Sequence, residues 1–417
     1  MEGKELDVVV LGATGVTGRR VAAYLAERAA EEGVRWGAAA RDSSKLARVL
    51  AEVGAGGGEE IEADAGDPAS LATLARRAAV VLNLVGPYTL HARPVIAACV
   101  EAGSHYLDLT GEIPFVRTIL RDFDAAAREA GIAIVQTCGF EALPPDLAVL
   151  LAAEAARERW GEELATVDLE VRVKAPPGLP RPSDGVSGGT SQSMVAVTAD
   201  PDAAVAADPA ALIEDPARAA RVRDASPIEV GVRRAGPAVI APMAPAAFIN
   251  PAVIQRTAEL TAADGSAPPF RYREGFALDG GAATLPARLA IAGALAATQA
   301  GMRRTLLAGP GTRRRVSSLL GRLLPSSGFG PDPGRLEGWR WSLRVEAATR
   351  GGQRVSVSAE ADGHPGYLTT ARILGEAGLV VAAEPPPGGG CLTPAAALGS
   401  ASAPRFGRAG LRFGVAG

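Results

Sequence analysis

The fold is decided by the stretch Leu6-Asp-Val-Val-Val-Leu11, which is followed by Gly12-Ala-Thr-Gly15-Val-Thr-Gly18. The first part is an almost continuous apolar run, which is typical of a strand buried on both faces of a parallel sheet. A helical pattern then runs from about Val16 to Glu32. We therefore predict a strand, a glycine-rich turn and a helix in succession, the context that a dinucleotide-binding loop requires.

Each glycine of this turn has its own expected role. Gly12 permits the tight turn out of the strand, Gly15 lets the backbone approach a pyrophosphate, and Gly18 lets the helix lie close to the sheet. The helix N-terminus directs free N–H groups and a positive dipole end at the phosphates. The alternative is a glycine turn with a structural role only. The residues expected to bind the dinucleotide here are Gly12, Ala13, Thr14, Gly15, Val16, Thr17 and Gly18.

The alternation of short apolar strands and longer helical segments continues to about residue 160. Right-handed βαβ units in series predict a doubly wound parallel sheet. Strands are expected at 34–40, 59–63, 80–85, 105–109 and 132–137. Helices are expected at 43–53, 68–77, 91–102 and 113–130.

The pattern changes beyond that point and predicts a second α/β domain with a mixed sheet. Residues 167–174 alternate apolar and polar side chains, as in a strand with one wet face, and 175–193 has the composition of a loop. An antiparallel strand pair is expected at 339–347 and 353–360. The tail, with helices at 367–377 and 394–399 and a strand at 379–382, is expected to pack back on the first domain. The predicted domains are 1–160, 161–363 and 364–417.

Composition excludes several classes of protein. With 43 Lys and Arg against 46 Asp and Glu, the net charge of −3 provides no basic field for nucleic-acid binding. Three cysteines and three histidines show no CxxC or HxxxH spacing, so no metal site is expected. The sparse cysteines, and a start at 1–7 without an apolar leader, indicate a cytoplasmic protein.

The residues after the second strand decide between NADP and NAD. Arg41 is placed to face an adenosine 2′-phosphate, with Ser43 and Lys45 as further donors. In the alternative, Asp42 accepts a hydrogen bond from the ribose and the cofactor is NAD. Further cofactor contacts are expected from Asp64, Asn83, Val85 and Gly86, of which Asp64 could instead serve the N-terminus of a helix.

Polar residues follow the fourth, fifth and sixth strands, where the crevice of such a sheet lies. They are Tyr88, His91, Asp108, Thr110, Glu112, Cys138 and Glu141. Hydride transfer to a polarised C=C or C=N bond leaves negative charge that a nearby acid must quench. Tyr88 is the first catalytic candidate, unless its ring packs over the nicotinamide. Cys138 and Asp108 are further candidates. Cys138 could instead form part of an apolar wall, and Asp108 could instead fix the loop by hydrogen bonds.

Two other mechanisms are not supported. A short-chain reductase needs Tyr-x-x-x-Lys, but Arg41 precedes Lys45 and Glu170 precedes Lys174 at that spacing. The formal GxSxG at 185–189 follows a proline-rich stretch instead of a strand, so no nucleophile elbow is expected.

Residues 289–302 carry no charge but are too few to cross a membrane as a helix. Arginines and leucines alternate after them as far as Leu324. One interpretation is a buried helix followed by a solvated one. The other is a basic amphipathic segment at 285–324 that contacts a membrane or a lipidic ligand.

Eight stretches resemble one known family. They are GATGVTG (12–18), ARDSSKL (40–46), NLVGPY (83–88), YLDLTGE (106–112), CGFEALPPDL (138–147), SGGTSQS (187–193), GYLTTARILGEAGL (366–379) and LTPAAALG (392–399). Their order and spacing are similar to those of the saccharopine dehydrogenase-like NADP-binding oxidoreductases, and nearest to the trans-acting enoyl reductases. Glu141 departs from the pattern, since the family more often has Asp there.

The resemblance implies a Rossmann-type NADP(H)-binding domain and an inserted α/β domain for substrate and dimerisation. It implies reduction of an unsaturated lipid or polyketide intermediate, free or carrier-bound, with Ser187 and Thr190 facing the cofactor or substrate. A homodimer and peripheral membrane contact through 285–324 are compatible with it. Two alternatives stay open: a reductase of C=N bonds in an amino-acid substrate, and a non-catalytic nucleotide-binding protein at lipid surfaces.

Overall fold

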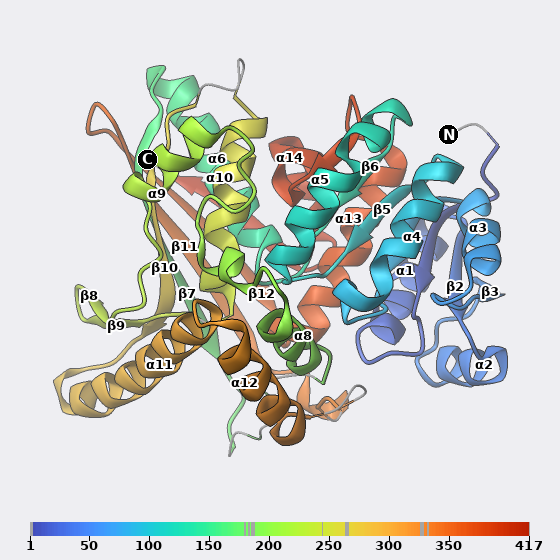
Figure 1. Ribbon diagram of the computed structural model, residues 1–417, viewed down its shortest axis with the longest axis horizontal. Coiled ribbons are helices and arrows are strands. Elements are labelled where there is room, and N and C mark those ends of the chain that lie inside the picture. Colours follow the sequence, from blue (N-terminus) through green and yellow to red (C-terminus); the bar gives the residue numbers. More distant parts are fainter. Residues whose placement is uncertain are drawn as a thin grey trace.

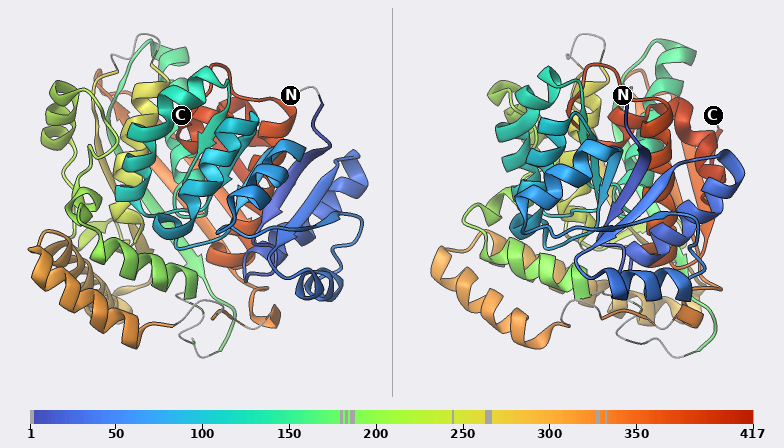
Figure 2. Two further views of the ribbon diagram at one scale, coloured as in Figure 1. Left: turned by 45° about the vertical axis from the view of Figure 1, so that its right-hand side comes forward. Right: turned by 90° about the vertical axis from the view of Figure 1, so that its right-hand side faces the viewer.

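The computed structural model describes residues 3–178, 181, 184, 188–243, 245–262, 267–325, 329–331 and 333–416. Two sheets and the helices around them make up this part of the chain (Figure 1, Figure 2). The α/β fold class predicted from the sequence is confirmed, with one parallel and one mixed sheet.

The first sheet has seven parallel strands in the order β13-β6-β5-β4-β1-β2-β3. The strands are β1 (Leu6–Leu11), β2 (Trp36–Ala40), β3 (Glu59–Glu62), β4 (Ala78–Asn83), β5 (His105–Asp108), β6 (Ala133–Val135) and β13 (Gly390–Leu392). Strand order reverses between β1 and β4, so a crevice is expected at the carboxyl ends of these two strands.

Helices connect these strands, and a further helix leads to the second sheet. They are α1 (Gly18–Glu32), α2 (Ser43–Glu52), α3 (Pro68–Arg77), α4 (Tyr88–Ala102), α5 (Ile113–Glu129) and α6 (Leu143–Trp160). Helices α1 to α5 lie close to the predicted positions, although α4 begins at Tyr88 and not at 91, and α6, which leads to the second sheet, was not predicted. Val8, Val9 and Val10 of β1 are fully buried, because helices cover both faces of the sheet.

The second sheet is mixed, with strand order β14-β12-β11-β7-β10-β9-β8. Its strands are β7 (Leu164–Lys174), β8 (Arg233–Ala235), β9 (Ala238–Ala241), β10 (Arg271–Leu278), β11 (Arg340–Thr349), β12 (Arg354–Asp362) and β14 (Leu411–Ala416). β7 and β10 pair in parallel, whereas β11 and β12 form the antiparallel pair expected from the sequence. α6 packs against β11 and β12 and so connects the two sheets.

The remaining helices surround the second sheet and the tail. They are α8 (Gly188–Ala199), α9 (Pro216–Ala225), α10 (Asn250–Leu260), α11 (Leu285–Leu306), α12 (Pro310–Leu323), α13 (Thr370–Ala383) and α14 (Pro394–Leu398). Short helical turns are η1 (Ala203–Ala207), η2 (Ala246–Phe248), η3 (Ala282–Thr284), η4 (Pro333–Arg335), η5 (Pro365–Thr369) and η6 (Ser400–Gly407). The loop expected at 175–193 is wrong at its end, because α8 begins at Gly188.

The tail differs in part from its prediction. Residues 379–382, expected as a strand, belong to α13, which packs against α1, β1 and β4. The strand that extends the first sheet is β13, which pairs with β6. β14 pairs with β12 and therefore lies in the second sheet. The domain boundaries at 160 and 363 remain a prediction.

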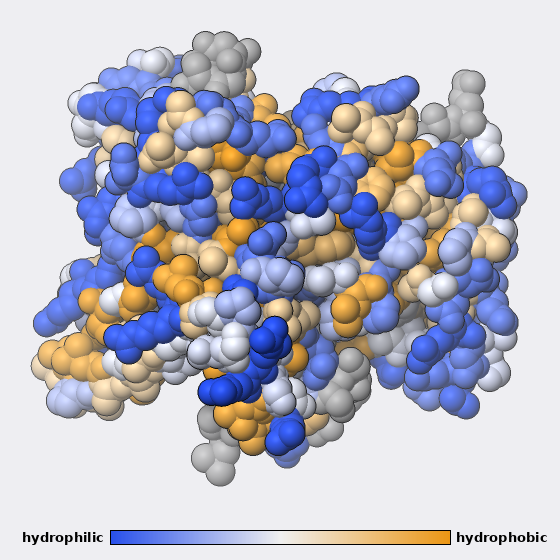
Figure 3. All heavy atoms as spheres, in the orientation of Figure 1, coloured by the Kyte–Doolittle hydropathy of each residue, from blue (hydrophilic) through white to orange (hydrophobic). Residues whose placement is uncertain are grey.

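The uncharged run at 289–302 lies in α11, and the buried-helix interpretation of it is wrong. Only Arg288, Ala292, Gln299 and Leu306 of α11 are buried, and the helix stands out from the body of the molecule (Figure 1). Apolar side chains are visible over this helix in the space-filling view (Figure 3). Within the described residues, no helix combines the length and the hydropathy needed to span a bilayer.

Candidate active site

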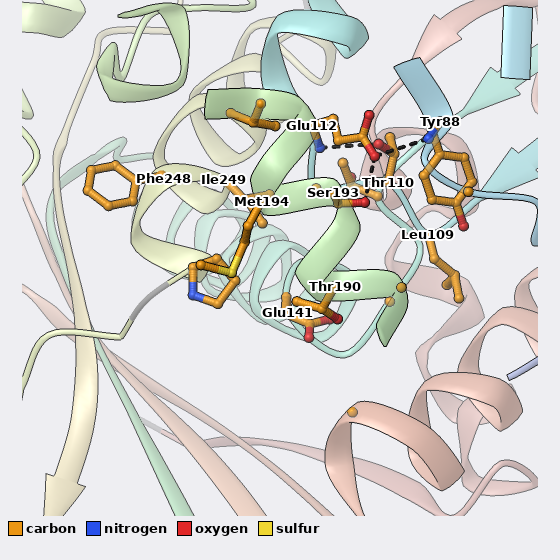
Figure 4. Close-up of a pocket in the computed structure, with 18 of the residues that line it drawn as sticks. Tyr88, Leu109, Thr110, Glu112, Glu141, Thr190, Ser193, Met194, Phe248 and Ile249 are labelled. Carbon is orange, nitrogen blue, oxygen red and sulfur yellow. Dashed lines mark hydrogen bonds between the residues drawn. The ribbon is translucent and has the colours of Figure 1, made fainter. Parts of the chain in front are cut away.

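A cavity of about 510 Å³ opens at the carboxyl ends of the strands of the first sheet. From that sheet it is lined by Gly15, Val16, Thr17, Gly18, Leu84, Gly86, Tyr88, Leu109, Thr110, Gly111, Glu112, Thr137, Gly139, Glu141 and Ala142. From the other side, α8 contributes Thr190, Ser193 and Met194, and η2 with the residue after it contributes Phe248 and Ile249 (Figure 4). α11 and α12 add Met302, Leu306 and Leu320. The cavity thus joins the glycine loop to an apolar chamber.

The glycine loop has the geometry of a cradle for a diphosphate. Gly12 has a φ of 89°, and a Cβ on it would lie 3.1 Å from the side chain of Val85. A Cβ on Gly18 would collide with the Gly12 carbonyl oxygen, so α1 packs directly on the turn. No described side chain caps α1 at Thr17, which leaves the helix N-terminus open towards the cavity.

At the end of β2, Asp42 and Arg41 have different surroundings. The Asp42 carboxylate caps α2, accepting from the Lys45 backbone N–H at 2.9 Å and from the Ser44 hydroxyl at 2.8 Å. These hydrogen bonds, both accepted by Oδ1, lower the pKa of Asp42. Arg41 is exposed and bonds to none of the described residues, so its guanidinium is available to a ligand. Ser43 and Lys45 lie exposed beside it at the start of α2.

Asp64 and Val85 lie at the ends of β3 and β4. Asp64 is exposed, and its carboxylate accepts from the Gly66 N–H at 2.9 Å, so part of its hydrogen-bonding capacity serves its own turn. Val85 packs against the glycine loop, and the neighbouring Gly86 lines the cavity.

Asn83 and Asp108 are fully buried and do not line the described cavity. The Asn83 amide donates to the Tyr106 hydroxyl at 3.0 Å, and that hydroxyl donates to Asp108 at 2.8 Å. Burial raises the pKa of Asp108 to about 7, although backbone N–H groups of Thr110 and Thr137 donate to it. This network fixes the ends of β4 and β5, which fits the loop-fixing alternative for Asp108.

Tyr88 lines the cavity at the start of α4, whereas Cys138 does not. The pKa of the Tyr88 phenol is well above its usual value because the ring is buried. Cys138 is fully buried, with Sγ 3.6 Å from the Val135 carbonyl oxygen, and burial also raises the pKa of its thiol. This placement fits an apolar wall. Thr190 lines the cavity from α8, and Ser187 lies outside the described residues.

Glu112 is the best-connected polar group in the cavity, and its role was missed from sequence. It accepts from the backbone N–H groups of Tyr88 at 3.0 Å and Thr89 at 2.8 Å, and from the Ser193 hydroxyl at 2.6 Å (Figure 4). The Thr89 hydroxyl is a further donor. Glu112 therefore holds the N-terminus of α4 and ties α8 to the first sheet. Its position after β5 marked it as a crevice residue, but its partners are distant in sequence.

The sequence matches a known family and named relatives. Residues 8–135 match the saccharopine dehydrogenase NADP-binding domain family. A Mycobacterium tuberculosis protein provisionally named a trans-acting enoyl reductase is 33% identical, over 98% of this chain and 97% of its own. The trans-acting enoyl reductase of Mycobacterium ulcerans is 32% identical over the same shares of the two chains.

Among solved structures, saccharopine dehydrogenase (L-Glu forming) from Saccharomyces cerevisiae shares the fold. It aligns with a TM-score of 0.53 over 98% of this chain and 99% of that chain, at 15% identity. The protein is an NADP-dependent oxidoreductase. By these matches, the chain belongs to the saccharopine dehydrogenase-like NADP-binding oxidoreductases, in the group of the trans-acting enoyl reductases.

Proposed function

We propose that this protein reduces a C=C bond in an unsaturated lipid or polyketide intermediate, with NADPH as the hydride source. The observation that carries the proposal is the course of the cavity. One end is lined by Gly15 to Gly18, and the other by Met302, Leu306 and Leu320. A long apolar chain fits such a chamber while its reactive end lies near the cofactor.

The chain's own residues would hold the cofactor at defined places. The glycine loop and the open N-terminus of α1 bind the diphosphate, and Arg41 binds the 2′-phosphate. When bound, the nicotinamide supplies a hydride. Tyr88 and Thr190 also line the cavity, and we expect them to orient substrate and exclude water there. On this proposal, 1–160 binds the cofactor and 161–363 receives the substrate.

The cavity chemistry argues against an amino-acid substrate. Such a substrate needs cations for its carboxylates, and no Lys or Arg is among the described residues that line the cavity. Three arginines of the second sheet that could bind carboxylates are engaged elsewhere, whereas a fourth, Arg234, is exposed and does not line the described cavity. Arg233 and Arg273 pair with Asp168 at 2.9 and 2.7 Å, and Arg271 pairs with Glu229.

The surface next to the apolar chamber suits a lipid phase. Leu289, Ile291 and Leu295 of α11 are exposed, as are Leu319 and Leu323 of α12. Residues 280–331 contain seven arginines and no acidic residue, and all of these arginines except Arg288 and Arg313 are at least partly exposed. We infer that this face contacts an anionic lipid surface, from which an acyl chain enters between α11 and α12.

The test is oxidation of NADPH with enoyl thioesters of short and long chains. Leu320→Glu places a charge in the chamber, and we expect turnover of long chains to fall while that of short chains is kept. Val415→Glu is the control, because Val415 is exposed on β14 and belongs neither to the described cavity lining nor to the face of α11 and α12. Equal loss on both chain lengths would contradict the proposed chamber. Cofactor binding without turnover of any thioester would favour a non-catalytic protein.

A further inference from the structure

Two carboxyl groups line the cavity, Glu112 and Glu141, and their surroundings differ. Glu112 accepts hydrogen bonds from four donors, three of them on α4 and one on α8. A carboxylate with that many donors is committed to accepting. It lies at the positive end of the α4 dipole, which also favours a negative charge.

Glu141 has much less support, because the one donor to its carboxyl among the described residues is its own backbone N–H. It lies on the loop between β6 and α6, and its side chain makes no ion pair and no hydrogen bond with another described side chain. In Figure 4, the dashed bonds run to Glu112 and none runs to Glu141. Burial raises the pKa of Glu141, because the apolar surroundings disfavour the charged form. Glu141 is therefore suited to carry a proton into the cavity.

The local backbone makes room for this carboxyl. A Cβ on Gly139 would lie 3.1 Å from Oε2 of Glu141, so the glycine leaves the space that the side chain occupies. The other titratable groups on the described walls are Tyr88 from α4 and Glu112 from the loop after β5. Tyr367 of η5 lies close enough for the Glu141 charge to raise its pKa. α8 contributes only the hydroxyls of Thr190, Ser193 and Thr198 as polar side chains here.

We propose that Glu141 is the catalytic acid, which gives its carboxyl proton to the α-carbon of the substrate. The proposal rests on the proposed enoyl reduction. A hydride from NADPH adds to the β-carbon, and the C=C electron pair moves onto the α-carbon and the thioester oxygen. The Glu141 O–H bond then breaks as the new C–H bond forms at the α-carbon. NADPH is oxidised to NADP⁺, and the Glu141 carboxylate regains a proton from solvent.

Tyr88, the first candidate from sequence, is the weaker acid of the two. Its phenol already has an ordinary pKa near 10, and burial raises it further. A backbone hydrogen bond with Leu109 also engages the phenol. A protonated carboxyl gives up its proton to an enolate with a much larger driving force.

Glu141→Gln tests the assignment, because Gln keeps the shape but has no acidic proton. We expect kcat for an enoyl thioester to fall about 100-fold or more, within the range of general acid catalysis. NADPH affinity, measured by calorimetry, should stay within about twofold of wild type. Glu141→Asp keeps a carboxyl and should recover part of the rate. The wild-type kcat should fall as pH rises through the raised pKa of Glu141, and the Gln variant should lose this dependence.

The label pattern distinguishes proton donation from a structural role. In D₂O, the wild type should place deuterium on one face of the α-carbon, whereas residual Gln-variant product should be labelled on both faces by solvent. Glu158→Gln, an exposed change of the same kind on α6, is the control and should leave kcat unchanged. An active wild type with an equally active Glu141→Gln would overturn the assignment alone. A wild type that reduces no enoyl thioester would overturn the proposed function, and this role with it.

Discussion

Gly15 and Gly18 lie three positions apart in the sequence, and a side chain at each would meet different obstacles. A Cβ on Gly15 would lie 3.3 Å from the Gly12 carbonyl oxygen, which a small shift relieves, whereas a Cβ on Gly18 would overlap that oxygen. We expect Gly15→Ala to lower stability by about 1 kcal/mol but to weaken NADPH binding at least tenfold, because the methyl group occupies phosphate space. Calorimetry and thermal unfolding measure the two effects.

Gly18→Ala is the matched contrast. The overlap forces α1 away from the turn, so we expect a loss of stability of about 3 kcal/mol, as for overpacked cores. A Gly15→Ala protein that binds NADPH like wild type would contradict a diphosphate at this loop.

We propose that Arg41, which follows β2, makes the protein prefer NADPH to NADH. Arg41→Ala removes a charge-assisted interaction worth roughly 1.5–3 kcal/mol, so NADPH affinity should fall about 10-fold to 100-fold. NADH affinity should stay unchanged, because NADH has no 2′-phosphate. Calorimetric titration with both nucleotides measures this ratio. Arg35→Ala, at the opposite end of β2, is the control, and an unchanged ratio in Arg41→Ala would exclude the assigned role.

The cofactor half of the site could be predicted because its signals are local. The glycine spacing and Arg41 follow their strands directly, so sequence order alone places them at one edge of the sheet. The substrate half could not be predicted in the same way. Glu112 and Glu141 differ in the hydrogen-bond donors around them, and the Ser193 donor to Glu112 is distant in sequence. Ser193 lies on α8, which was predicted as a loop because residues 187–193 are rich in Gly and Ser.

At the scale of elements, the first sheet was predictable as far as β6, because each buried strand is followed by a helix with clear ends. α13 was misread because it is buried nearly all round. A buried helix with the run Leu379-Val-Val cannot be told from a strand by periodicity. β13 has three residues and becomes a strand only by pairing with β6, so no local pattern marks it.

The Asp146 carboxyl contacts three helices, so we expect the free energy of unfolding to depend on whether it is protonated. It lies on α6 and accepts from Thr257 Oγ1 of α10 at 2.6 Å and from the Ala395 N–H of α14 at 2.9 Å. Burial raises its pKa to about 7, well above the usual value near 4. Because the folded state binds this proton more tightly, its contribution is full below about pH 4 and is lost as pH rises through about 7.

We therefore expect the free energy of unfolding to decline less between about pH 4 and pH 7 in Asp146→Asn than in wild type, by about 2 kcal/mol or more. Urea unfolding at several pH values measures this. Part of the decline should persist in the variant, because burial also raises the pKa values of Asp108 and Glu274 to about 7. Asp67→Asn, at the exposed start of α3, is the control. An unaltered slope in Asp146→Asn would contradict the assigned protonation.

At the scale of the whole molecule, the cavity depends on contacts between distant parts of the chain. The first sheet supplies the cofactor loop, α8 bonds to it through Ser193 and Glu112, and α11 and α12 close the apolar end. The same two helices carry exposed leucines and arginines on their outer sides (Figure 3). α11 and α12 thus carry both the chamber wall and the charged apolar surface. On the proposal that this surface binds lipid, binding would bring the chamber to the substrate.

Arg314 and Arg315 test this arrangement, because both are exposed on α12. Each arginine near an anionic membrane contributes about 1 kcal/mol, so Arg314→Gln with Arg315→Gln should weaken binding to phosphatidylserine vesicles roughly 30-fold. Co-sedimentation measures this, and added salt should reduce wild-type binding in the same direction. Arg48→Gln with Arg76→Gln, exposed on α2 and α3, is the matched control and should bind like wild type. Turnover of a soluble short-chain thioester should be equal in all three proteins, since neither pair lines the described cavity. If the α12 pair bound vesicles as well as wild type does, the lipid-facing role of this surface would be wrong, and the chamber would have to fill from solvent or from a carrier.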